Sequence, residues 1–215
     1  MSPRDDDRQP MVGRRAPLID GIEKVSGKAE YTADIDHANA FVGRLFRSPY
    51  AHAEIISVDV SKARELPGVI AVITGDDCDK PFGIIPIAQN EFPLSRDKVR
   101  YCGEPVAAIA AIDEASAEAA LKLIDFKVKE LPGYFTADDA RADDAVLLHD
   151  DRPGNLEREV HSEFGDVDAG FEAADLVREE TYDCAEVTHA HMEPHASLAT
   201  YDVERDRVTL HSVTQ

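Results

Sequence analysis

The sequence is short of cysteine, of basic residues and of long apolar runs, and each shortage excludes a class of protein. Cys78, Cys102 and Cys184 lie far apart without a CxxC pair, which favours free thiols in a reducing cytoplasm over a disulfide scaffold or a cysteine-ligated cluster. No window approaches the roughly 18 apolar residues of a membrane-spanning helix. The opening MSPRDDDRQP also lacks the apolar stretch of a secretory signal. We therefore expect a cytoplasmic protein that does not enter a membrane.

Positive charge is scarce, with 23 Lys and Arg against 43 Asp and Glu among 215 residues, a formal net charge of -20. Such a surface repels phosphate backbones and anionic lipid headgroups, so neither a nucleic acid nor a membrane surface is expected as a partner. The acids are unevenly spread, because residues 132–186 carry 17 acids and only 4 bases. This block opens with Pro132-Gly133 and favours an acidic linker over residues 132–157. The alternative is the acidic outer face of one domain.

The first 131 residues alternate strand-like and helix-like patterns, which predicts an α+β domain. Residues 69–74 (VIAVIT) are continuously apolar and β-branched, so we expect a strand buried on both faces. Asp113 is a helix N-cap before an Ala/Leu pattern with spacings of three and four. The other expected elements are strands over 40–47, 54–60, 99–101, 105–112 and 125–131 and a short helix over 61–66.

The last block predicts one helix and three strands. Asp166 can cap the helix VDAGFEAA, and strand-like runs cover 176–186, 196–202 and 207–215. Residues 203–206 (VERD) are a tight connection, so the last two runs are expected to pair as a hairpin. The final strand runs to Gln215 without a turn or cap, and such an edge needs a second chain or a continuation to cover it.

Residue chemistry alone completes no catalytic site. His189, His191 and Glu193 could face one side of a strand and present a metal with two imidazoles and a carboxylate, but the spacing fits no established zinc signature. The alternative is a strand end whose polar groups bond to neighbouring backbone. Cys102 lacks an activating cation nearby in sequence and is more readily a structural thiol than a nucleophile. Glycine-rich phosphate loops and a GxSxG elbow are absent.

Eight short motifs in a fixed order resemble the large subunits of the molybdenum hydroxylases, the xanthine dehydrogenase and aldehyde oxidase family. They are DGIEKVSGKAEY (20–31), RSPYAHAEI (47–55), PGVIAVITGDD (67–77), VRYCGEPVAAIAA (99–111), ELP (130–132), FGDVDAGFEAADLV (164–177), HMEP (191–194) and the closing Thr214-Gln215. Within the family, residues 81–101 and LLHDD (147–151) most resemble the α subunit of 4-hydroxybenzoyl-CoA reductase.

The resemblance implies a domain order. Residues 1–11 would be a disordered tail, 12–131 an α/β-hammerhead domain, 132–157 the acidic linker, and 158–215 the beginning of a molybdopterin-binding domain. In the family, the glutamine of such a Thr-Gln pair lies beside the apical oxo ligand of molybdenum, and Gln215 matches that position. Its amide can donate a hydrogen bond without adding charge near the metal. The resemblance assigns no histidine ligand to the metal, so it places HAHMEPH near the cofactor cavity as a strand region.

The resemblance also implies a function that is shared with other polypeptides. This chain would brace a molybdopterin cofactor, in its cytosine dinucleotide form, together with the remainder of the molybdopterin-binding subunit. An iron–sulfur subunit with [2Fe-2S] clusters and an FAD subunit would carry electrons. The complex would hydroxylate or dehydrogenate an aromatic, N-heterocyclic or aldehyde substrate, or remove a phenolic hydroxyl from an aromatic acyl-CoA. The isolated chain would not be active. The alternative is a non-catalytic scaffold subunit that retains the hammerhead fold.

Overall fold

The computed structural model describes residues 15–83, 85 and 89–213. The expected disordered tail, residues 1–11, and the predicted cofactor residue Gln215 lie outside this range. The chain divides into two units, which are described separately below. One unit is residues 39–177, here called the central unit. The other, the terminal unit, joins residues from both ends of the chain, 1–38 and 178–215.

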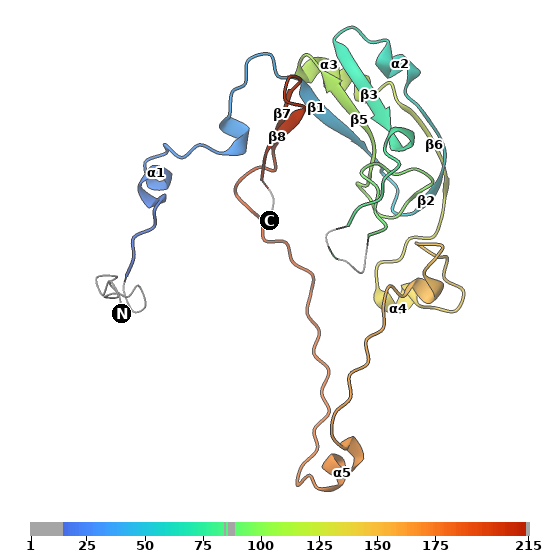
Figure 1. Ribbon diagram of the computed structural model, residues 1–215. Helices are drawn as coiled ribbons and strands as arrows, with labels where there is room; N and C mark the ends of the chain where they lie inside the picture. The colour runs from blue at the N-terminus through green and yellow to red at the C-terminus, as the bar shows by residue number, and fades with distance from the viewer. Residues whose placement is uncertain (1–14, 84, 86–88, 214–215) are drawn as a thin grey trace. The chain divides into compact units, whose positions relative to one another are not determined.

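Helices and strands alternate along the described chain (Figure 1). In order, the elements are α1 Gly21–Val25, η1 Thr32–Asp34, β1 Val42–Arg47, β2 Ala53–Asp59, α2 Ser61–Arg64, β3 Val69–Thr74, η2 Gly75–Asp77, β4 Lys98–Val99, β5 Pro105–Ala111, α3 Glu114–Leu121, β6 Asp125–Glu130, α4 Ala137–Ala140, η3 Pro153–Asn155, α5 Val167–Glu172, β7 Ser197–Asp202 and β8 Arg207–Ser212. The strands and helices predicted before residue 132 are all present, with ends that differ by at most three residues.

The central unit contains two antiparallel sheets of three strands, with the orders β1-β5-β3 and β4-β2-β6. In each sheet the middle strand pairs with strands that are distant in sequence. Helix α3 lies against the first sheet, where it contacts all three strands (Figure 1). The terminal unit contains the predicted hairpin, in which β7 and β8 pair from Ser197↔Ser212 to Asp202↔Arg207.

Helix α3 begins where the sequence predicts. The Asp113 carboxylate accepts a hydrogen bond from the backbone N–H of Ser116 at 2.7 Å, which satisfies one of the free donors at the helix start. This hydrogen bond is also the main reason that the pKa of Asp113 lies below its ordinary value. Ala117 and Ala120 are fully buried, and their small side chains let the helix backbone approach the sheet closely. The predicted cap and face of this helix are confirmed.

Two apolar clusters form the core of the central unit. The first lies under α3 and includes Val72 and Ile109, and the second joins Val99 and Val106 near β4. Phe46 packs against both clusters and meets Phe126 edge to face, with ring centroids 5.6 Å apart. This aromatic pair connects the two sheets, so both share one continuous interior.

The prediction that residues 69–74 form a strand is confirmed, but the prediction that both its faces are buried is wrong. Strand β3 is an edge strand of an antiparallel sheet, in which only Val72 is buried. Ile70 and Ile73 are 51% and 41% exposed. A continuous apolar run is typical of a strand inside a parallel sheet, and sequence alone does not distinguish that case from an edge strand.

The strand predicted over residues 176–186 is wrong. The structure gives this run no regular secondary structure, and all its residues are exposed. Strand propensity there comes from Leu176, Val177 and Tyr182, but a strand forms only when another strand offers hydrogen bonds. Asp166 does cap α5, since its carboxylate accepts from Ala169 N–H at 2.9 Å.

Among the described residues, no helix is long and apolar enough to cross a membrane.

The core predicts how the central unit responds to truncation. Ile109→Ala removes a side chain that is 2% exposed and should lower the free energy of unfolding by about 2–5 kcal/mol, since it leaves a cavity under α3. Urea unfolding followed by circular dichroism measures this loss. The matched control is Ile70→Ala on the neighbouring edge strand, where the half-exposed side chain should cost less than about 1 kcal/mol. Equal losses would contradict the assignment of the core to the α3 side.

Candidate functional site

The histidines that the sequence offers as possible metal ligands are exposed in the terminal unit. His189 and His191 stack with ring centroids 5.2 Å apart, and His195 lies 6.2 Å from His191. Glu193 is partly exposed and does not join them in a ligand cluster. In the described residues, no three His, Cys, Asp or Glu side chains gather closely enough to hold a metal ion. The structure therefore does not bring the two imidazoles and the carboxylate together.

Cys102 lies in the turn between β4 and β5. Its thiol is exposed, and the sulfur is 3.6 Å from the carbonyl oxygen of Pro49, a weak hydrogen bond. The next residue, Gly103, has a φ of +94°, a value that favours glycine and makes the tight turn possible.

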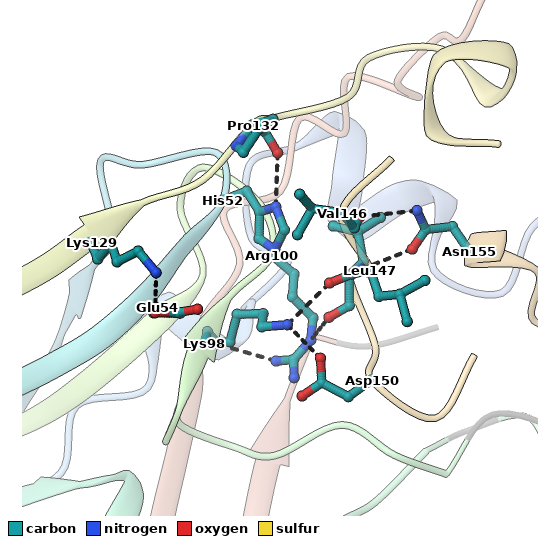
Figure 2. A network of polar contacts seen from close by, with 11 residues as sticks. His52, Glu54, Lys98, Arg100, Lys129, Pro132, Val146, Leu147, Asp150 and Asn155 are labelled. Carbon is teal, nitrogen blue, oxygen red and sulfur yellow. Dashed lines mark hydrogen bonds and ion pairs between the residues drawn. The ribbon is translucent and has the colours of Figure 1, made fainter. Parts of the chain in front are cut away.

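The strongest polar cluster lies instead at β4, where two cations contact the acidic segment, residues 132–157 (Figure 2). The Lys98 ammonium donates to the carbonyl oxygen of Leu147 at 3.0 Å and to the Asp150 carboxylate at 2.8 Å. Its side chain is only 11% exposed, whereas that of Asp150 is 86% exposed. A buried ammonium must be paired, so Lys98 requires this segment in place.

Arg100 makes the second contact with the same segment. Its Nε donates to the carbonyl oxygen of Leu148 at 3.0 Å, and its Nη1 donates to the carbonyl oxygen of Lys98 at 3.1 Å. The backbone N–H of Arg100 donates to the carboxylate of Glu104. The planar guanidinium thus bridges two chain segments 48 residues apart.

The acidic segment is also folded upon itself. Asn155 Oδ1 accepts from Leu148 N–H at 2.8 Å, and its Nδ2 donates to the carbonyl oxygens of Ala140 and Val146 at 2.8 and 3.1 Å. The hydroxyl of Tyr134 accepts from Val146 N–H at 2.8 Å. These side chains form hydrogen bonds with backbone groups that have no partner in a helix or strand, because the segment contains little regular structure.

His52 fixes the start of the segment. Its ring is 1% exposed, and Nδ1 lies 2.8 Å from the carbonyl oxygen of Pro132. Its own carbonyl oxygen accepts from Leu131 N–H at 2.9 Å. The contacts of His52, Lys98 and Arg100 hold the acidic segment against the sheet β4-β2-β6 (Figure 2). Composition predicts a water-exposed linker here, whereas the structure gives it a defined conformation. The boundaries 132 and 157 stay a prediction.

Two pKa shifts follow from this arrangement. The hydrogen bond and charge of Lys98 lower the pKa of Asp150, so the contact persists at neutral pH and is lost as the pH falls through this lowered value. Burial, and then the charge of Arg100, lower the pKa of His149 from its ordinary 6.5. The imidazole is therefore neutral near pH 7. Because the unfolded chain binds this proton more readily, His149 lowers stability as the pH falls below 6.5.

The sequence reasoning did not single out Lys98, Arg100, His149 or Asn155 as site residues. A signal did exist, because the two cations of Lys98-Val99-Arg100 stand out in a chain with few bases, and a block with 17 acids follows. That signal does not identify which residues the two cations contact, because the sequence does not fix the distance between charges that lie about 50 residues apart. The contacts to Leu147 and Leu148 go to carbonyl oxygens, which no side-chain pattern reveals.

Two family models match the chain in succession. Residues 26–132 match the a/b hammerhead domain of aldehyde oxidase and xanthine dehydrogenase, and residues 148–215 match the molybdopterin cofactor-binding domain. The chain belongs to the xanthine dehydrogenase and aldehyde oxidase family. Its fold is accordingly a hammerhead domain followed by the start of a molybdopterin-binding domain, as the sequence motifs predict. In this family member, the β4 contacts join the last part of the hammerhead sheet to the residues where the second match begins.

Relatives and solved structures agree with this assignment. The chain is 37% identical over 196 residues to the nicotinate dehydrogenase large molybdopterin subunit of Eubacterium barkeri, covering 90% of this chain and 45% of that protein. It is 35% identical over 207 residues to the xanthine dehydrogenase molybdenum-binding subunit of Escherichia coli, covering 92% and 27%. The structure of quinoline 2-oxidoreductase from Pseudomonas putida 86 superposes with a TM-score of 0.79 at 27% identity, covering 92% and 26%. The chain thus spans less than half the length of each of these proteins.

The β4 contacts predict the effect of removing one cation. Lys98→Met should leave the Leu147 carbonyl oxygen unpaired at a cost of about 1–3 kcal/mol and loosen residues 145–155 from the sheet. Hydrogen exchange at Leu148 and Asn155, measured by mass spectrometry or NMR, should accelerate. The matched control is Lys129→Met, which removes an exposed lysine paired with Glu54 and should not change exchange in that segment. Unchanged exchange in Lys98→Met would contradict the role of Lys98.

Proposed function

We propose that this chain supplies the N-terminal portion of the molybdopterin-binding subunit of an oxidoreductase and braces its cofactor domain. The observation that carries the proposal is the succession of the two family matches, hammerhead and then cofactor-binding domain, joined by a segment that Lys98 and Arg100 hold in place. The three relatives and structures named above are, by name, oxidoreductases of related type. The chain's hammerhead would fix the position at which the cofactor domain begins.

The end of the hairpin β7–β8 is the described part of the chain that comes nearest in sequence to the proposed cofactor residue Gln215. Among the described residues, no His, Cys, Asp and Glu side chains gather into a metal-ligand cluster. When bound, the molybdenum cofactor supplies the two-electron redox chemistry. At the end of the hairpin, Val213 N–H donates to the carbonyl oxygen of Ala196 at 3.1 Å, and the hydroxyls of Ser197 and Ser212 lie 2.8 Å apart. These contacts fix the chain immediately before Thr214 and Gln215.

The finer assignments are proposals as well. The cofactor would carry the cytosine dinucleotide, and [2Fe-2S] and FAD subunits would transfer electrons in the cytoplasm. The motifs at 81–101 and 147–151 favour a dehydroxylating reductase of aromatic acyl-CoA esters within the family. The match to a nicotinate dehydrogenase subunit favours an N-heterocyclic acid instead. Product analysis of the assembled enzyme with both substrate types separates these alternatives.

Molybdenum content tests the proposed function. The 215-residue chain is produced together with the remainder of the molybdopterin-binding subunit, purified, and analysed by inductively coupled plasma mass spectrometry. We expect near-stoichiometric molybdenum in the complex and none in the 215-residue chain alone, because neither part holds the whole cofactor site. A stable complex without molybdenum would contradict the proposal and support a non-catalytic scaffold. Zinc or iron bound by the chain alone would support a histidine site at His189 and His191.

Gln215 gives a second test in the same complex. Gln215→Ala removes an amide that we place next to the metal centre, so turnover should fall by about 10- to 100-fold, as with other outer-shell partners of a metal. Molybdenum content and assembly should not change. The matched control is Gln89→Ala, which makes the same substitution at an exposed position of the central unit. Turnover equal to wild type in Gln215→Ala would remove Gln215 from the site.

A further inference from the structure

Strand β3 is an outer strand of the sheet β1-β5-β3, and its outer edge has no partner strand among the described residues. Such an edge presents backbone N–H and C=O groups with which a strand of another chain can pair. Proteins commonly protect an edge strand by placing a charged residue or a proline within it. Residues 69–74 (VIAVIT) contain neither, and the side chains of Ile70 and Ile73 are exposed. An uncharged, β-branched run of this length is typical of segments that pair with copies of themselves.

The other outer strands of the two sheets in the central unit carry charges. Strand β1 contains Arg44 and Arg47, β4 contains Lys98, and β6 contains acids and bases over Asp125–Glu130. Charged side chains within a strand oppose the approach of a second strand. Of the described outer strands in these sheets, β3 alone is uncharged. Its edge is therefore protected by residues outside the strand, if it is protected at all.

Arg64 occupies one backbone group of this edge. It is the last residue of α2, which lies next to β3 (Figure 1). Its Nη2 and Nε donate to the carbonyl oxygen of Val72 at 3.0 and 3.3 Å. The guanidinium thus takes the position that a backbone N–H of a neighbouring strand would take.

Asp77 occupies a second backbone group, two residues further along β3. It belongs to η2, which follows the strand, and its carboxylate accepts from the backbone N–H of Thr74 at 2.9 Å. In an antiparallel pair, every second residue directs both its N–H and its C=O away from the partner strand. Val72 and Thr74 are two residues apart, so their bonds to Arg64 and Asp77 identify them as the outward row of β3.

Arg64 and Asp77 also contact each other, and together they are called the edge cap below. Arg64 Nη2 lies 3.9 Å from the Asp77 carboxylate, and both side chains are about half exposed. An ion pair at this distance and exposure adds little stability of its own. The edge cap therefore acts mainly through the two backbone groups that it occupies. A register shift between Val69 and Ala71 makes the start of the strand irregular, so the edge cap covers the regular part.

We propose that the edge cap prevents β3 from pairing with the β3 of a second copy of this chain. Two such strands would pair antiparallel about a two-fold axis, so both copies would use the same groups. Because β3 is uncharged, this pairing brings no charges of the strands themselves into contact, unlike a pairing through β1 or β6. The N–H of Val72 points outward with its C=O, and it would donate to the second copy.

The test removes half of the edge cap and measures self-association of the whole 215-residue chain. Arg64→Met keeps an apolar stem but removes both donors to Val72. Sedimentation velocity should show self-association strengthened by about tenfold relative to wild type, the effect expected when one backbone acceptor is released for pairing. The matched control is Lys62→Met, which removes the same charge from an exposed position of the same helix and should associate as wild type does.

Hydrogen exchange at the Val72 amide, measured by NMR, locates the association. Pairing through β3 should slow this exchange in Arg64→Met, whereas loosening of the strand would accelerate it. Asp77→Ala opens the other half of the edge cap and should also strengthen self-association, which keeps the test decisive if Arg64→Met does not fold.

A rescue variant separates pairing through β3 from association elsewhere. Ile73→Lys, added to Arg64→Met, places a charge at an exposed position of β3 and should return self-association to the wild-type level. The proposal is overturned if neither cap variant associates more than Lys62→Met, if exchange at Val72 accelerates in the associated variant, or if Ile73→Lys does not restore the wild-type level. None of these results bears on the proposed function, which is judged by molybdenum content and turnover.

Discussion

The buried ammonium of Lys98 is the constraint on which the central unit depends. An ammonium that is nearly excluded from water must have partners, and among the described residues the Lys98 ammonium donates to Leu147 and Asp150. Arg100 adds a bond to the neighbouring carbonyl oxygen, so two cations from one short strand hold a chain segment that follows about 50 residues later. The segment therefore has a defined conformation although it contains little regular secondary structure and much negative charge.

The contacts of Lys98 and Arg100 connect the two regions of the chain that match the two family models. The hammerhead match ends at residue 132, and the cofactor-domain match begins at 148. The residues between them are attached at both ends, by His52 at Pro132 and by Lys98 at Leu147. The start of the second domain is thus fixed by contacts to the first.

Much of the fold could be predicted because its signals are local. Asp113 with Ser116 starts α3, alanine spacing sets its buried face, and VERD closes the hairpin β7–β8. The errors share a different cause. The run 69–74 is apolar in either a central or an edge strand, and Leu176 to Glu186 has strand propensity but no partner strand among the described residues. Whether a strand is buried or paired depends on which other segments pack against it in the fold. The strand propensity of its own residues does not give that information.

The sequence by itself determined the strands and helices of residues 40–131, the hairpin β7–β8 and, through motifs in succession, the family. Only the tertiary structure decided which of the chain's few cations are buried and which carbonyl oxygens they meet. The reason is that a periodic pattern or a helix cap determines the local structure of only a few neighbouring residues. Contacts across 48 to 52 residues depend instead on how two sheets pack and where the chain returns.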